Sequence, residues 1–308
     1  MIVSASRRTD IPALYADWFC NRLKEGFVLI PNPRNPQRLG RVELSPRNVD
    51  CIVFWTKNPA PMFHRFKEIE KLGYPFIVQF TLTAYDATIE RGLPPKKAVI
   101  ENFIELAGRI GPDRVVWRYD PIIVDHRFSA EWQARQFSSL CERLASHTHR
   151  CVVSFVDPYK SLARQFRGVE QEEMFEVAQA LSHTARQHGL GLTTCAEEVD
   201  LSPYGVEHGA CVDVRHIEQI LGSRLHIKAD ANQRPMCLCA EAVDVGAYDT
   251  CTHGCAYCYA VSSPKALARN RAAHDPLAPM LTGFPTGVES VTDRTRGSHK
   301  ILQGSLFE

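Results

Sequence analysis

Apolar residues along the chain fall into short continuous runs that alternate with longer segments of helical periodicity. The runs are rich in Val, Ile, Phe and Cys, as in CIVFW and CVVSFV, and such runs are typical of parallel strands covered on both faces. The predicted strands are Ile2–Ser6, Cys51–Thr56, Phe76–Thr83, Arg114–Tyr119, Cys151–Val156 and Gly191–Cys195, with weaker candidates at Leu225–Ala229 and Val243–Tyr248.

Between these runs, apolar residues recur every three or four positions, which indicates helices with one buried face. The apolar stripes lie within residues 15–23, 62–69, 99–110, 137–144 and 174–185. Strand and helix alternate about every 35 to 40 residues, which predicts a parallel (β/α) barrel or a doubly wound sheet. Because no linker-like segment interrupts the pattern, we predict one α/β domain over residues 1–265, a parallel (β/α) barrel of six to eight strands. Residues 266–308 show little periodicity and are predicted to be a C-terminal extension.

Polar side chains gather where the predicted strands end. In a barrel of this type the carboxyl ends of the strands hold the active site, so these groups are expected to converge there. Taken singly, each also fits an ordinary polar loop. They are Ser4, Ser6, Thr9 and Asp10 after the first strand, Lys57 after the second, Arg118 and Asp120 at the fourth, Glu197 after the sixth and Lys228 after the seventh.

Charge and hydropathy exclude some classes of partner. The chain has 36 basic and 35 acidic residues, so its net charge does not indicate a nucleic-acid or anionic-membrane partner. No dense basic stripe with interleaved aromatic residues is present, and no apolar stretch is long enough for a membrane-spanning helix. The first residues do not resemble a signal peptide. We therefore expect a cytoplasmic protein that does not bind a membrane.

The eleven cysteines are distributed unevenly, and seven of them fall between Cys195 and Cys258. In a reducing compartment such a cluster indicates metal binding more than disulfides. The strongest motif is the run Cys251-Thr-His-Gly-Cys255-Ala-Tyr-Cys258. Three thiolates in one short loop can bind three irons of a [4Fe–4S] cluster, and the fourth iron then stays open. A zinc site completed by His253 is the alternative.

A second group of cysteines lies earlier in the chain: Cys195, Cys211, Cys237 and Cys239. Four thiolates are a full ligand set for an auxiliary [4Fe–4S] cluster or for a structural zinc ion. The alternative is that Cys195 and Cys211 are small buried apolar residues, a common role of free cysteine.

The spacing of Cys251, Cys255 and Cys258 resembles the signature of the radical S-adenosylmethionine superfamily. In that superfamily the amino and carboxylate groups of S-adenosylmethionine chelate the open iron, and an electron from the cluster breaks a sulfonium C–S bond. The resemblance places Tyr257 beside the adenine.

The segments SASRRTDIPA, FWTKNPAP, RYDPII and VDVGAYDTCTHGCAYCYA together resemble a bacterial family known as domain of unknown function 1848, over about Met1 to Asn270. That family carries at its C-terminal end a cysteine cluster like the one that radical enzymes carry near their N-terminal end. The resemblance implies a circularly permuted barrel, in which the cysteine-loop strand Val243–Tyr248 comes last and lies beside Ile2–Ser6. The turn after the first strand then takes the place where the superfamily binds the methionine amino group. Its usual glycine-rich motif is absent, so Ser4, Ser6, Thr9 or Asp10 is expected to substitute for it.

A weaker likeness links Thr56-Lys57, Glu90–Pro94 and Arg118–Ile123 to spore-photoproduct-lyase-like enzymes. It implies that Arg118 and Asp120 contact the carboxylate or ribose of the cofactor, since a guanidinium suits a carboxylate and a carboxylate suits ribose hydroxyls. The alternative is an ion pair that ties strand ends together.

The sequence therefore predicts a radical S-adenosylmethionine-type enzyme with a [4Fe–4S] cluster at Cys251, Cys255 and Cys258 and a second metal site. It would need an external flavodoxin- or ferredoxin-like electron donor and would act on a small molecule or peptide. Two alternatives stay open. One is a zinc-stabilised α/β binding protein without redox chemistry, and the other is a lyase-like repair enzyme acting on nucleic acid.

Overall fold

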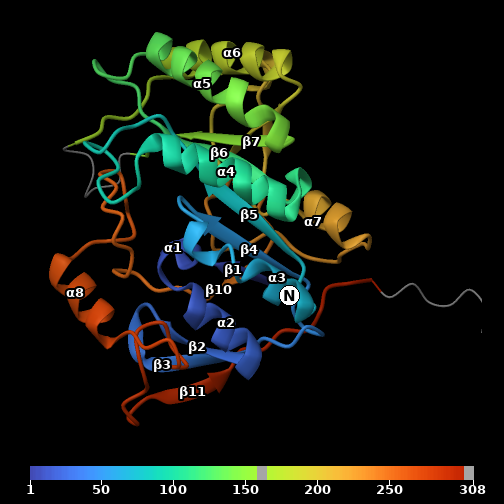
Figure 1. Ribbon diagram of the computed structural model, residues 1–308, viewed down its shortest axis with the longest axis vertical. Coiled ribbons are helices and arrows are strands. Elements are labelled where there is room, and N and C mark those ends of the chain that lie inside the picture. The colour runs from blue at the N-terminus through green and yellow to red at the C-terminus, as the bar shows by residue number, and fades with distance from the viewer. Residues whose placement is uncertain (158–164, 302–308) are drawn as a thin grey trace, which may run out of the picture.

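The computed structural model describes residues 1–157 and 165–301. Its centre is one eight-stranded sheet in the order β10-β1-β4-β5-β6-β7-β8-β9, in which every neighbouring pair is parallel (Figure 1). This confirms the predicted α/β class with a parallel sheet. The strands are β1 Ile2–Ala5, β4 Cys51–Thr56, β5 Phe76–Thr81, β6 Val115–Ile122, β7 Arg150–Phe155, β8 Gly191–Cys195, β9 Glu207–Gly209 and β10 Ala242–Asp244.

The six main predicted strands are all present, and the differences lie in the two weaker ones. The predicted strand Leu225–Ala229 is not a strand, because Leu225 and Ala229 each form only an isolated bridge. The predicted strand Val243–Tyr248 is shortened to β10. It ends at Asp244, whose carboxylate accepts a hydrogen bond from the Gly246 amide (3.0 Å) and so turns the chain out of the sheet.

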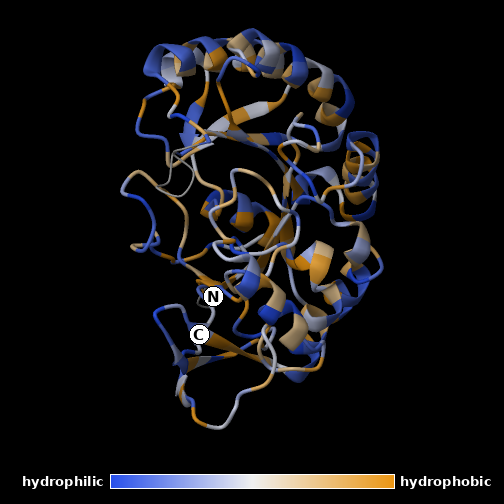
Figure 2. Cartoon of the chain, turned by 90° about the vertical axis from the view of Figure 1, so that its left-hand side faces the viewer, coloured by the Kyte–Doolittle hydropathy of each residue, from blue (hydrophilic) through white to orange (hydrophobic). Residues whose placement is uncertain are grey.

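One face of the sheet is covered by helices. Alternate residues of a strand point to opposite faces, and those on this face include Phe54, Phe76, Phe80 and Trp117. They form one large core with the apolar sides of the helices, while polar residues occupy much of the helices' outer surface (Figure 2). The helices of this layer are α2 Ala16–Glu25, α3 Phe66–Lys71, α4 Lys96–Ile110, α5 Ala130–Leu144 and α6 Gln171–Gln187. The shorter elements are the four-residue helix α1 Ile11–Leu14 and the 3-10 helices η1 Ala60–Met62, η2 Pro112–Arg114, η3 Ala145–His147 and η4 Ser202–Tyr204.

The opposite face of the sheet has a different cover. Its residues, such as Ile2, Val53, Ile77 and Val116, pack against the chain segment that connects β9 to β10. This segment contains α7 (Val214–Leu221) and buried cysteines. The core of this face is therefore built by a cysteine-rich connection and not by crossover helices.

A second, three-stranded sheet was not predicted. It has the order β11-β3-β2, with β2 Phe27–Asn32, β3 Asn35–Glu43 and β11 Ser290–Asp293. The apolar pattern misses it because the first half of β3 is polar and exposed. Together with α8 (Pro264–Ala273), it lies at the bottom of Figure 1. The part of the predicted extension beyond residue 301 lies outside the described residues.

The two edges of the large sheet are β9 and β10. Among the described residues these edge strands do not pair with each other, and closure into a barrel stays a prediction. The segments next to them do meet: the Ala240 amide donates to the Val212 carbonyl at 3.0 Å. Within the same residues, no helix has the length and hydropathy needed to cross a bilayer.

Candidate functional site

The cysteine loop, residues 251–258, follows β10 at the carboxyl edge of the sheet. Its three cysteines are neither fully buried nor exposed. Burial, together with the neighbouring charge of Asp10, raises the pKa of Cys251 to about 12. Burial also raises the pKa of Cys255 to about 11, although the positive charge of Lys57 opposes this shift. Without a bound cation the thiols of Cys251 and Cys255 are therefore protonated at neutral pH, and binding a cation would release their protons.

The loop is fixed to the turn after β1 through Asp10. One carboxylate oxygen of Asp10 lies 2.9 Å from His253 Nε2 and accepts a hydrogen bond from the Lys57 amide at 2.7 Å. The other oxygen accepts from the Ala13 amide at 3.0 Å. Because Asp10 binds Nε2, the ring nitrogen of His253 that remains for the alternative zinc site is Nδ1.

The loop is also paired with the segment after β5. The Gly92 amide donates to the His253 carbonyl at 2.7 Å, and the Ala256 amide donates to the Ile89 carbonyl at 2.8 Å. A Cβ atom at Gly92 would lie 2.8 Å from the carbonyl oxygens of His253 and Thr252. Only glycine allows the two backbones to approach this closely.

Glu90 is the centre of a buried network beneath the loop. Its carboxylate accepts from Lys57 Nζ and Lys96 Nζ, both at 2.8 Å, from Thr83 Oγ1 at 2.9 Å, and from the Tyr257 hydroxyl. Burial alone raises the pKa of Glu90, but the charges of the two lysines outweigh it and lower the pKa to about 2. The network fixes the ring of Tyr257, which the sequence placed beside adenine.

The turn after β1 is organised by Asp244 at the end of β10. Ser6 Oγ donates to this carboxylate at 2.5 Å, Ser4 Oγ at 3.2 Å and the Arg7 amide at 2.9 Å. Thr9 Oγ1 is buried and has no hydrogen-bond partner in the described structure. Of the four candidates for the methionine amine, the two serines thus bind Asp244, Asp10 binds the cysteine loop, and only the Thr9 hydroxyl is unpartnered.

Arg118 and Asp120 bind each other, and they also contact two further groups. The second guanidinium nitrogen of Arg118 donates to Cys211 Sγ at 2.5 Å, and Ser154 Oγ donates to Asp120 at 2.5 Å. The predicted role of this pair at the cofactor stays a prediction.

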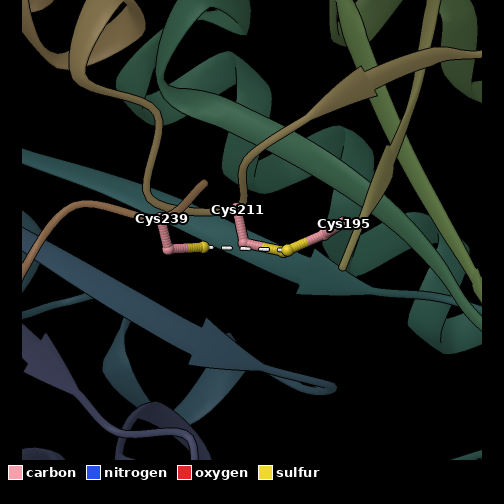
Figure 3. Close-up of side chains that lie close together, drawn as sticks. All are labelled: Cys195, Cys211 and Cys239. Carbon is pink, nitrogen blue, oxygen red and sulfur yellow. Dashed lines mark hydrogen bonds between the residues drawn. The ribbon is translucent and has the colours of Figure 1, made fainter. Parts of the chain in front are cut away.

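Three cysteines of the second group lie together on the covered inner face of the sheet. The sulfurs of Cys195, Cys211 and Cys239 are all within 4.8 Å of one another, and Figure 3 shows them pointing toward one another. The Sγ atoms of Cys195 and Cys239 are 3.7 Å apart. Hydrogen bonds from neighbouring thiols lower the pKa of Cys239. Among the described residues, this is the one group of three or more His, Cys, Asp or Glu with ligand atoms this close.

Cys237, the fourth predicted member, lies outside this tight group. It is half-buried and lies two residues before Cys239 in the chain.

Sequence reasoning missed several residues of the two sites. Negative charge on Cys239, Cys211 and Cys195 raises the pKa of Arg7 against the effect of its burial, and Arg7 Cζ lies 4.7 Å from the centre of the Trp55 ring. Glu90 and Asp244 had no visible partner in the sequence. A carboxylate inside the apolar pattern of the last predicted strand, Val243–Tyr248, was a usable signal for Asp244.

A cavity lies away from both cysteine groups. It has a volume of about 450 Å³, and its lining includes Val115 and Arg150, the first residues of β6 and β7. It therefore opens at the amino ends of the strands, opposite the cysteine loop.

Comparisons with known proteins give a family but no activity. The model of the family described as "Domain of unknown function (DUF1848)" matches residues 2–260, most of the chain, as predicted from the motifs. No curated protein matches. Among solved structures, a crystal structure of a "putative alpha-L-fucosidase" from Bacteroides thetaiotaomicron is 10% identical, with 51% of this chain and 67% of that chain covered. Its TM-score is 0.23, so this likeness supports no conclusion about fold or function.

Proposed function

We propose that this chain, which belongs to the family of domain of unknown function 1848, is a radical S-adenosylmethionine-type enzyme. One observation carries the proposal. The loop with Cys251, Cys255 and Cys258 leaves β10 at the carboxyl edge of a parallel sheet, beside the turn after β1. This edge is where α/β enzymes of this architecture place their cofactors.

The number of ligands favours an iron–sulfur cluster over zinc. Three thiols in eight residues leave one iron of a [4Fe–4S] cluster without a protein ligand, whereas a structural zinc ion takes four protein ligands. The residues of the loop thus fit a cluster with one open iron.

The bound cofactors would supply the bond cleavage: one electron from the cluster would break a C–S bond of S-adenosylmethionine chelated at the open iron. The residues of this chain would bind and orient the cofactors and would exclude water from them. Asp10, Gly92 and Ile89 hold the loop through His253 and the backbone. Thr9 offers an unpartnered hydroxyl in the turn where the methionine amine is expected.

Glu90 and Lys57 contribute the electrostatics of the loop. The Tyr257 hydroxyl binds Glu90, which fixes the aromatic face for an adenine ring. Burial raises the pKa of Cys255, and the positive charge of Lys57, whose Nζ lies 5.3 Å from the centre of the Tyr257 ring, opposes this rise and so favours the thiolate that iron requires. The electron would come from an external flavodoxin- or ferredoxin-like protein, and the substrate would be a small molecule or peptide.

The proposal is tested by purifying the full chain without oxygen. We expect a brown protein with about four irons in this loop, which releases 5′-deoxyadenosine when given dithionite and S-adenosylmethionine. A variant with Cys251, Cys255 and Cys258 all changed to Ala loses both properties. Cys141→Ala, which removes a buried cysteine of α5, is the matched control and keeps both. A colourless protein with zinc bound by these three cysteines contradicts the proposal and favours the zinc-stabilised binding protein.

A further inference from the structure

We propose that Cys195, Cys211 and Cys239, with Cys237 as the fourth ligand, hold a single zinc ion that joins the two edges of the eight-stranded sheet. The sulfurs concerned are separate from the cysteine loop, so this inference does not depend on the proposed function.

The spacing of the sulfurs fits one ion better than a cluster. Zinc–sulfur bonds of about 2.3 Å in a tetrahedron put the sulfurs about 3.8 Å apart. Cys195 Sγ and Cys239 Sγ are 3.7 Å apart, and Cys211 Sγ is within 4.8 Å of both. In a four-iron cluster each thiolate binds a different corner of a cube, so the sulfurs diverge and lie farther apart than they do around one ion.

The surroundings supply the charge that such a site needs. Four thiolates around Zn²⁺ leave two negative charges in a buried place, and a buried charge is costly unless it is paired. Two guanidinium groups provide the opposite charge. Arg118 Nη1 donates to Cys211 Sγ, and negative charge on Cys239, Cys211 and Cys195 raises the pKa of Arg7 against the effect of its burial. The Val212 amide also donates to Cys239 Sγ at 3.4 Å, the kind of outer contact that orients a metal ligand.

The fourth ligand is held near the group by its own segment. Cys237 is half-buried and only two residues from Cys239, so the same short segment carries both. The Met236 carbonyl accepts a hydrogen bond from His208 Nε2 at 2.8 Å, beside β9. These contacts keep the pair Cys237 and Cys239 next to the other two cysteines.

The positions of the ligands in the fold give the ion a structural role. Cys195 ends β8, Cys211 comes just after β9, and Cys239 comes just before β10. Since β9 and β10 are opposite edges of the sheet, the ion would join edges that no strand pairing joins in the described residues. One backbone hydrogen bond, from the Ala240 amide to the Val212 carbonyl, already crosses at this point. The ion would therefore close the sheet where a complete barrel has a ladder of hydrogen bonds.

X-ray absorption at the zinc and iron edges of the full chain, purified without oxygen, tests this proposal. We expect one zinc per chain, with four sulfurs at about 2.3 Å and no neighbouring metal. The chain with Cys251, Cys255 and Cys258 all changed to Ala keeps this zinc, which separates the result from the proposed function. Cys211→Ser with Cys239→Ser loses it, and Cys141→Ala keeps it.

Three results would overturn the proposal. The first is iron with iron neighbours in the triple Ala variant, which indicates a second cluster. The second is a metal-free site in both the native chain and that variant. The third is a shell of three sulfurs and one oxygen or nitrogen, which removes Cys237 from the ligand set. Hydrogen exchange provides a further measurement: removal of zinc with a chelator should speed exchange at the amides of β9 and β10 before those of β5 and β6.

Discussion

The two cysteine regions of this chain differ in what brings their sulfurs together. In the loop of residues 251–258 the cysteines are neighbours in the sequence, and the fold positions them through other groups, chiefly His253, Gly92 and Tyr257. In the second region Cys195, Cys211 and Cys239 come from three separate segments, and the fold brings the sulfurs themselves into contact.

The difference is informative because it separates two roles of a bound metal. A loop that is fixed by its non-cysteine atoms keeps its place when the metal is absent, which suits a cofactor site with one open position. A buried site whose ligands span both edges of a sheet contributes the metal's binding energy to folding. We therefore expect damage to the first region to affect chemistry and damage to the second to affect stability.

The largest effect is expected from Cys255→Ala. The change removes one of three iron ligands, so release of 5′-deoxyadenosine should fall to the background of the assay. The midpoint of thermal unfolding should shift by only a few degrees, because the loop keeps its contacts through His253 and Gly92. Measuring both quantities on one preparation checks the contrast. A variant that still releases 5′-deoxyadenosine, or one whose midpoint of thermal unfolding falls by far more than a few degrees, would contradict it.

Next in size is Cys211→Ser. The change removes a proposed ligand of the buried metal and leaves Arg118 beside a neutral hydroxyl. It should therefore lower the free energy of unfolding by about 4 kcal/mol. Urea unfolding measures the loss. Cys141→Ala, which removes a buried thiol from α5 and no ligand, should cost about 1 kcal/mol. Equal losses in the two variants would mean that the second region holds no stabilising metal.

Glu90→Gln should have a smaller effect, about 3 kcal/mol, because two lysines lose a buried carboxylate partner. Its pH dependence has a defined sign. The pKa of Glu90 is lowered to about 2, so its contribution is complete above the unfolded value of about 4.3 and is lost as the pH falls from there toward 2. Urea unfolding of native and variant protein at several pH values should show the two curves converging in that interval. Glu101→Gln, at an exposed glutamate, is the control. If the difference in free energy of unfolding between Glu90→Gln and the native chain does not shrink as the pH falls, the result contradicts the proposed role of the network.

The smallest effect is expected from Gly92→Ala, about 2 kcal/mol, since the new Cβ must displace the carbonyls of His253 and Thr252. The displaced loop should also bind less iron. Gly108→Ala, in α4 with open space around its Cβ, should instead stabilise the chain by about 0.8 kcal/mol. Iron analysis and urea unfolding of the pair measure these effects. Full iron content in Gly92→Ala would show that the close backbone approach does not position the loop.

The sequence predicted the parts of the molecule that depend on local pattern. β4 is a nearly continuous apolar run, and both β4 and β8 have the limits predicted for them. β3 escaped prediction because its first residues are polar, and β9 because three residues carry too little pattern. The spacing of the cysteine loop was visible because its ligands are adjacent in sequence.

The remaining features depend on partners that are far apart in the chain. Asp244 meets the turn after β1 across more than two hundred residues, and Glu90 meets Tyr257 across more than one hundred. No local pattern encodes such pairs. The sequence grouped Cys195, Cys211, Cys237 and Cys239. Only the structure gives the separations of the sulfurs of Cys195, Cys211 and Cys239, on which the proposal of a single ion in place of a cluster is based.

The most direct test of the account is electron paramagnetic resonance of the dithionite-reduced chain before and after addition of S-adenosylmethionine. We expect the signal of a reduced [4Fe–4S] cluster, and we expect that signal to change when the cofactor binds the open iron. Cys195→Ser should show the same change, while Cys251→Ala should show no such signal. A signal that does not respond to S-adenosylmethionine, or one that persists in Cys251→Ala, would contradict the assignment of the cofactor to the loop of residues 251–258.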